Sequence, residues 1–214
     1  MERQELKRFV SVADALDILG PAKVITREQA LRAWYATELE ADPPLKYGEV
    51  VLRCCAEDNR QGQTDWRLVR IIGFSLAELY EVSQTYFLSG QPRFGPNRWW
   101  LSQDEKSWAG AFPGHGYYLV DFGPRSDGRW GGVPWAEQSS NICRLGTVYE
   151  RAHEAMVCEA VVSFAATHGE QLLASWCHWG RSVTAAGQRV CVGYNPRDGV
   201  VVSHASDHRS DLRV

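Results

Sequence analysis

The chain has 214 residues and a formal net charge of −3, with 44% hydrophobic and 23% charged residues. This composition excludes wholesale disorder, and the length predicts one domain or one domain with a small annex. The mild acidity argues against a general polyanion binder. The N-terminal residues lack an apolar signal core, and uncharged runs are far shorter than the ~18 residues of a membrane span, so we expect a cytoplasmic protein without a membrane partner.

Capping patterns predict two N-terminal helices, over residues 11–19 and 26–39. Gly20-Pro21 ends the first helix and Asp42-Pro43-Pro44 ends the second. We expect a helical hairpin over residues 1–44, as an annex to an α+β domain over residues 45–214. A helix-turn-helix DNA-binding regulator is an alternative. However, the connector is long and the second helix carries both Arg and Glu, so a nucleic-acid partner is not expected.

The rest of the chain predicts further helices and a small sheet. Ser75 and Glu78 form a capping box, and Thr147 opens the longest helix, which runs to about Thr167. Strands are predicted over 66–72, 117–122, 172–180, 189–194 and 200–204, the last two joined as a hairpin. The predicted fold is α+β, with helices packed on one face of a small antiparallel sheet.

Residues 90–136 form a long, aromatic and glycine-rich segment in which regular elements cannot be continuous. It holds five of the nine Trp and nine of the 19 Gly residues. A long irregular segment rich in rings favours a contact surface, because Trp offers a large rigid area with a polar handle. The alternative is that the rings fill a core covered by loops. The candidate ligand-binding residues are Trp99, Trp100, Trp108, Trp130, Trp135 and His115.

Glu159 interrupts the apolar stripe of the predicted helix 147–167. A carboxylate at that position would be desolvated, which raises its pKa unless a cation pairs with it. Glu159 is therefore a candidate general acid or base of a hydrolase, or else one half of a structural ion pair.

His178 is the second catalytic candidate, since Cys177-His178 is flanked by Trp on both sides. A one-residue change in strand register would place His178 beside either His204 or Cys191. A Cys–His pair would supply a nucleophile and a base for hydrolysis. The alternative is a half-buried histidine whose hydrogen bonds are satisfied within the fold.

Motifs for cofactors are absent from the sequence. The six cysteines form no C-x-x-C pair, and we expect free, buried thiols. His153-Glu154 begins like the zinc-protease motif but lacks the second histidine, and no phosphate-binding glycine motif is present. We therefore expect no metal and no cofactor. The leading hypothesis is a non-catalytic binding protein whose aromatic segment contacts an unknown protein or small-molecule ligand.

Five short segments follow one another in a set order along the chain: Ile18-Leu19-Gly20 with Lys23-Val24-Ile25-Thr26, residues 65–69, residues 116–119, residues 150–154, and His178-Trp179-Gly180. This order resembles that of a set of uncharacterised bacterial proteins. The resemblance spans most of the chain and implies a bacterial, cytosolic origin. It brings no activity, ligand or catalytic residue.

Overall fold

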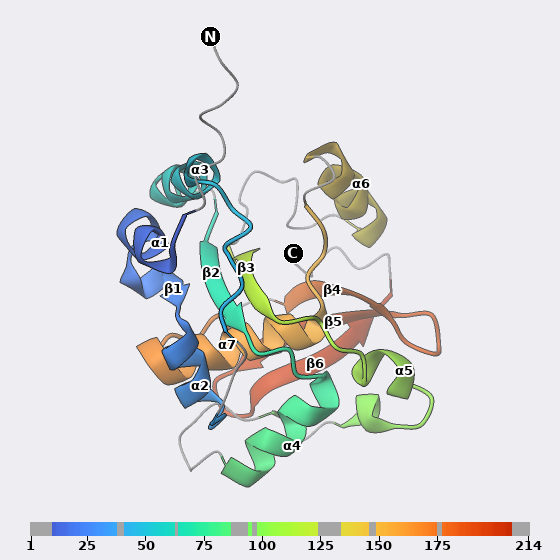
Figure 1. Ribbon diagram of the computed structural model, residues 1–214. Helices are drawn as coiled ribbons and strands as arrows, with labels where there is room; N and C mark the ends of the chain where they lie inside the picture. The colour runs from blue at the N-terminus through green and yellow to red at the C-terminus, as the bar shows by residue number, and fades with distance from the viewer. Residues whose placement is uncertain are drawn as a thin grey trace.

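Two small sheets and seven helices make up the part of the chain that the computed structural model describes, which is residues 10–37, 41–62, 64–86, 94–95, 98–123, 134–145, 149–174 and 177–206 (Figure 1). The helices are α1 (Val12–Leu19), α2 (Arg27–Ala33), α3 (Glu49–Arg60), α4 (Leu76–Tyr86), α5 (Lys106–Ala109), α6 (Trp135–Leu145) and α7 (Glu154–His168). The strands are β1 (Val24–Ile25), β2 (Trp66–Ile71), β3 (Gly116–Asp121), β4 (Cys177–Val183), β5 (Arg189–Asn195) and β6 (Gly199–Ala205). Two short 3-10 turns are η2 (Pro21–Lys23) and η3 (Trp99–Leu101).

The α+β class is confirmed, but the prediction of a single antiparallel sheet with helices on one face is wrong. In the first sheet β1 lies parallel to β2, and β2 pairs antiparallel with β3, with Leu68 opposite Leu119. The second sheet is antiparallel in the order β4-β5-β6. Its β5–β6 hairpin is confirmed, with Tyr194 opposite Val200. Two sheets form because both can then bury a face against the same helix.

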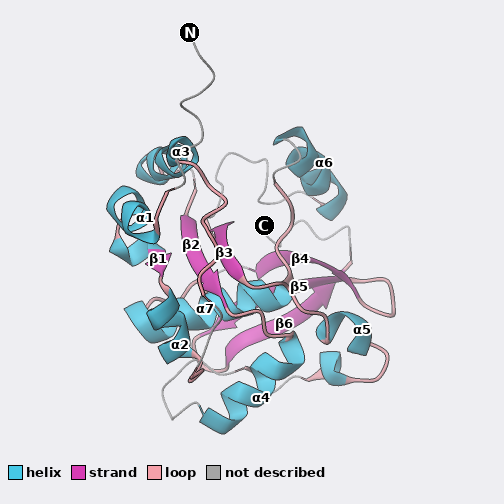
Figure 2. Cartoon of the chain, in the orientation of Figure 1, coloured by secondary structure: helices cyan, strands magenta, loops and turns pink. Residues whose placement is uncertain are grey.

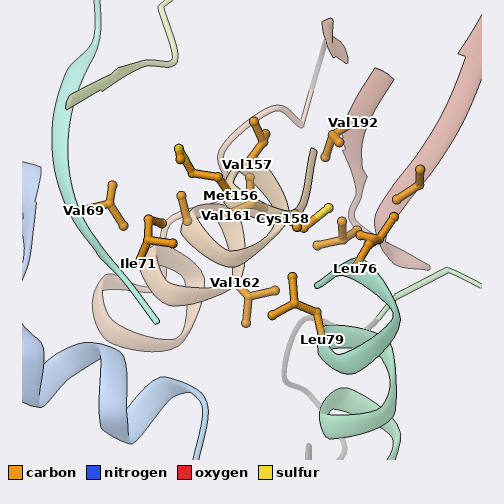
Figure 3. Packing of buried hydrophobic residues seen from close by; sticks show 14 of the residues in the cluster. Val69, Ile71, Leu76, Leu79, Met156, Val157, Cys158, Val161, Val162 and Val192 are labelled. Atoms are coloured by element: carbon orange, nitrogen blue, oxygen red, sulfur yellow. The ribbon is translucent and has the colours of Figure 1, made fainter. Parts of the chain in front are cut away.

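That helix is α7, which lies in the middle of the molecule beside strands of both sheets (Figure 2). Every residue from Glu154 to Phe164 is buried. Its apolar residues surround the helix axis instead of forming one stripe, which is the pattern of a helix buried on all sides. Figure 3 shows Val69 of β2, Leu79 of α4 and Val192 of β5 around the α7 side chains. α7 therefore joins the two sheets into one hydrophobic core.

α7 begins later than Thr147, so the predicted start of this helix is wrong; residues 146–148 lie outside the described part. His153 is the N-cap, and its Nδ1 accepts a hydrogen bond from the Ala155 amide at 3.1 Å. Gly169 closes the helix in the left-handed conformation, with φ of +68°. Residues 149–153 are thereby left non-helical, next to the start of the central helix.

The N-terminal region contains a strand where a helical hairpin was predicted. Both predicted capping boxes are present, at Ser11 and Thr26. Between the two helices, however, β1 pairs with β2, so α1 and α2 do not form a helix-turn-helix. The division at residue 44 stays a prediction, although Ile25 and Trp34 lie in the same core cluster as α7.

A buried arginine connects β2 to the end of α7. The Arg67 guanidinium donates to Asp65 at 2.6 Å and to Glu170 at 2.6 Å, and lies 4.7 Å from the Phe164 ring centroid. The Arg67 side chain is 2% exposed, whereas that of Glu170 is 41% exposed. This network fixes the first sheet on the central helix.

We expect the substitution Arg67→Met to lower the free energy of unfolding by about 2 kcal/mol, because it removes charge-assisted hydrogen bonds to Glu170 and Asp65, of which Asp65 keeps its ion pair with Lys23 at 2.7 Å. Urea unfolding followed by circular dichroism measures this. The control is Arg53→Met, which removes an exposed ion pair with Glu49 on α3 and should cost less than about 1 kcal/mol. Equal losses for both variants would contradict the assignment of Arg67 as a buried connector.

Candidate functional site

A cavity of about 300 Å³ lies between β3, β4, α6 and the residues that lead into α7. Its volume is at the lower end of the range for small-molecule sites, roughly 300–1,000 Å³. The lining residues are the aromatic Tyr47, Trp66, Tyr118 and Tyr149, the charged Lys46, Asp121, Glu150, Arg151 and Arg181, the histidines His153 and His178, and the apolar Pro113, Leu119, Val120, Ile142, Ala152 and Met156.

The cavity has a buried inner end and an exposed rim. Arg151, His153 and His178 are buried, as are the apolar Val120 and Met156. The rim side chains are exposed: Lys46, Tyr149, Glu150 and Arg181. A molecule entering from solvent would therefore meet aromatic and charged groups first, and then a cation and two imidazoles.

Arg151 is a buried cation held by neutral groups. Its guanidinium donates to the Trp135 carbonyl at 3.1 Å, to the Gln138 side-chain oxygen at 3.3 and 3.4 Å, and to the Ser139 hydroxyl at 3.1 Å. These three residues belong to α6, which lies at the edge of the molecule (Figure 2). Within the described ranges no carboxylate pairs with Arg151.

One indole ring supports two guanidinium groups. The Cζ atom of Arg151 lies 4.5 Å from the centroid of Trp135, and that of Arg189 lies 3.7 Å from it. Stacking of this kind stabilises a cation that has lost part of its hydration. Burial, with a further contribution from Arg189, lowers the pKa of Arg151 to about 10, so the group still carries its charge at pH 7.

Both histidines of the inner end are neutral at pH 7. Burial lowers the pKa of His153 to about 4, and Arg181 adds to the shift. Burial also lowers the pKa of His178 to about 4, with Arg151 as the second cause. The Nδ1 atom of His178 is buried and has no hydrogen-bond partner among the residues described. This nitrogen is out of reach of solvent, so the His178 ring borders the cavity with its other atoms.

The carboxylates near the cavity are engaged elsewhere or lie in solvent. Asp121 accepts hydrogen bonds from the backbone amides of Asp65 at 2.8 Å and Gly123 at 2.9 Å. Glu150 is exposed at the rim. Glu154 is buried and accepts from the amide and hydroxyl of Ser182, at 2.6 and 2.8 Å. None of these groups balances the charge of Arg151.

Glu159 does not line the cavity. It is fully buried and accepts hydrogen bonds from the backbone amides of Ile72 and Gly73, the second at 3.3 Å. Burial raises the pKa of Glu159 to about 8, against the opposing effect of these amides and of Arg70. The contacts are those of a structural carboxyl group that holds the end of β2 on α7.

His178 lines the cavity, but Cys191 lies on the other face of the sheet. His178 is opposite Val192 across the β4–β5 pair, and Cys191 is opposite Trp179. Neighbouring positions on a strand point to opposite faces, so His178 and Cys191 do not form the nucleophile–base pair considered above. The cavity wall contains no cysteine within the described ranges.

The cysteines are free, and Cys54 and Cys143 are exposed, contrary to the expectation that all are buried.

The described rings of the aromatic segment pack mainly on the protein itself. Trp100 and Trp108 are buried in the main core cluster. Trp99 is half-buried, donates to the Val202 carbonyl at 3.1 Å, and lies against the His204 ring. These placements match the core-filling alternative.

The other candidates of that segment differ in their surroundings. Trp135 is half-buried and stacks with Arg151 of the cavity wall and with Arg189, which lies outside that wall. His115 is exposed and does not line the cavity, and Trp130 lies outside the described residues. A ligand-binding role for any of these six residues stays a prediction.

Sequence reasoning did not identify Arg151 or Tyr118. One signal was available for Arg151, because it stands with His153 immediately before an almost wholly apolar helix, where a charged side chain is next to the core. No local signal marks Tyr118, whose position in the wall depends on the β2–β3 pairing.

No family model, curated protein or solved structure matches this chain. Within the described residues every helix is too short or too polar to cross a bilayer. The described residues also contain no group of three or more His, Cys, Asp or Glu side chains that could hold a metal ion.

Proposed function

We propose that this protein binds a small anionic molecule in the cavity, with Arg151 as the charged contact. The observation that carries the proposal is the buried guanidinium of Arg151, whose acceptors among the described residues are all neutral. Buried charges in proteins are usually paired, because the loss of hydration costs several kcal/mol. An anionic group on a ligand would supply the missing countercharge.

The proposal keeps the binding function expected from the sequence but moves the contact surface to the cavity. Trp135 supports this site indirectly, because its ring and carbonyl hold Arg151. The hydrolase alternative receives less support, since Glu159 lies outside the cavity and Cys191 is on the far face from His178.

Titration with benzoate, acetate and phenyl phosphate tests the proposal. We expect at least one of these anions to bind the full chain and to shift the NMR signals of the His178 and Tyr118 side chains. In Arg151→Met, affinity should fall about ten-fold or more, because a hydrogen bond to a charged group contributes about 1.5–3 kcal/mol.

Two controls accompany this experiment. Arg53→Met removes an exposed arginine of α3 and should leave binding unchanged. Arg151→Lys keeps the charge without the planar fork and should bind with intermediate affinity. Absence of binding for all three anions, or equal binding by wild type and Arg151→Met, would overturn the proposal.

A further inference from the structure

The inner end of the cavity offers several hydrogen-bonding groups and a single buried cation. Nη1 of Arg151 carries two N–H groups and makes one hydrogen bond to a described residue, the Gln138 oxygen. Nδ1 of His153 accepts from a backbone amide, which leaves the proton of this neutral imidazole on Nε2.

These groups suit a carboxylate better than a phosphate. The two oxygens of a carboxylate can accept about four hydrogen bonds between them, and one negative charge balances one buried guanidinium. A phosphate monoester carries about −1.5 to −2 charges at pH 7. The remaining cations of the wall, Lys46 and Arg181, are exposed at the rim, where water already solvates them.

The outer end of the cavity is aromatic. The rings of Trp66 and Tyr149 lie with their centroids 6.2 Å apart at an interplanar angle of 48°. Tyr118 of β3 faces the same cavity, with Nζ of Lys46 5.3 Å from its centroid. Tyr149 is 41% exposed although it is a large hydrophobic residue. Three rings from three parts of the chain favour a flat, apolar body at this end.

We infer that the ligand is an aryl monocarboxylate, whose carboxylate contacts Arg151 while its ring lies among Trp66, Tyr118 and Tyr149. This inference rests on the proposed function and adds the chemical class of the ligand. It makes Tyr149 a specificity-determining residue, which contacts the ring of the ligand and not its charge.

Affinities of the full chain for benzoate, acetate, phenyl phosphate and benzyl alcohol, measured by calorimetry or NMR titration, test the inference. We expect benzoate to bind about ten-fold tighter than each of the other three, because only benzoate combines one negative charge with a ring. Acetate lacks the ring, phenyl phosphate carries a phosphate in place of the carboxylate, and benzyl alcohol has the ring without a negative charge.

Tyr149→Ala isolates the ring contact. We expect this variant to weaken benzoate about five-fold and acetate less than about two-fold. The matched control is Phe112→Ala, which removes another exposed ring, 65% exposed, that is not part of the cavity wall. The control should leave both affinities unchanged.

The possible outcomes separate the inference from the proposed function. If no anion binds, or if binding does not depend on Arg151, both are overturned. If anions bind through Arg151 but acetate or phenyl phosphate equals benzoate, only the inference is overturned. The same holds if Tyr149→Ala weakens acetate as much as benzoate. If the Arg151 variant does not fold, the affinities of the wild-type chain for the four compounds still test the inference.

Discussion

Replacing Gly180 by alanine is expected to lower the free energy of unfolding by about 4 kcal/mol. A Cβ atom on this β4 residue would lie 2.0 Å from Oε1 of Glu154 and 2.5 Å from its Cγ and Cδ atoms. Glu154 is fully buried and is held by the amide and hydroxyl of Ser182. The whole Glu154 side chain would have to move. The variant would then lose the buried hydrogen bonds between Glu154 and Ser182, in addition to the cost of overpacking.

Urea unfolding of wild type and variant measures this loss. The control is Gly95→Ala, because the atoms nearest to its added Cβ are 3.5 Å away, at ordinary contact distance. In a Glu154→Ala background the Gly180→Ala change should cost less than about 1 kcal/mol, since the obstructing carboxylate is gone. An equal cost in both backgrounds would show that the close approach of Glu154 is not the cause.

The second large effect is a pH-dependent contribution of Glu159 to stability. Burial raises the pKa of Glu159 from 4.5 to about 8 in the folded protein. Between these values the folded state keeps a proton that the unfolded state releases. The contribution of Glu159 is therefore complete below about pH 4.5 and is lost as the pH rises through 8.

Comparison of wild type with Glu159→Gln isolates this contribution. The free energy of unfolding of wild type, relative to the variant, should fall by about 1.4 kcal/mol per pH unit. Between about pH 5 and pH 8 the relative loss is about 4 kcal/mol. Glu154, His153 and His178 also have shifted pKa values, but they are present in both proteins, so their effects cancel.

Urea unfolding at pH 5, 6.5 and 8 measures the difference. Glu150→Gln serves as the control, because it makes the same substitution at an exposed carboxylate. If the curve of Glu159→Gln runs parallel to that of wild type, Glu159 is already ionised over this pH range, and its amide hydrogen bonds outweigh the effect of burial.

Local features of the fold were predictable from the sequence. The capping boxes at Ser11 and Thr26 depend on residues three positions apart, and both are present. The turn from Asn195 to Gly199 likewise sets the register of the β5–β6 hairpin by itself. The two-sheet arrangement was not predictable, because it depends on which faces pack on α7. The start of α7 was also missed, since His153 acts as its cap although a Ser or Thr is the usual choice.

The candidate site was predictable only in part. His178 was identified from its position on an aromatic strand, and it lies in the cavity wall. Glu159 was identified as a carboxyl group within an apolar helix and is fully buried, but the Ile72 amide that it contacts is 87 residues away in the chain. The cavity joins residues from Lys46 to Arg181, and only the tertiary fold brings them together.

The complete burial of α7 determines how the protein unfolds. A helix that is buried on every side is destabilised when either sheet unfolds, because the apolar residues that this sheet covers would then face water. Neither sheet can therefore detach as an independent subunit, and denaturation should proceed in one concerted step. Deuterium should enter the amides of residues 155–164 only through that global event, more slowly than at the solvent-facing ends of α3.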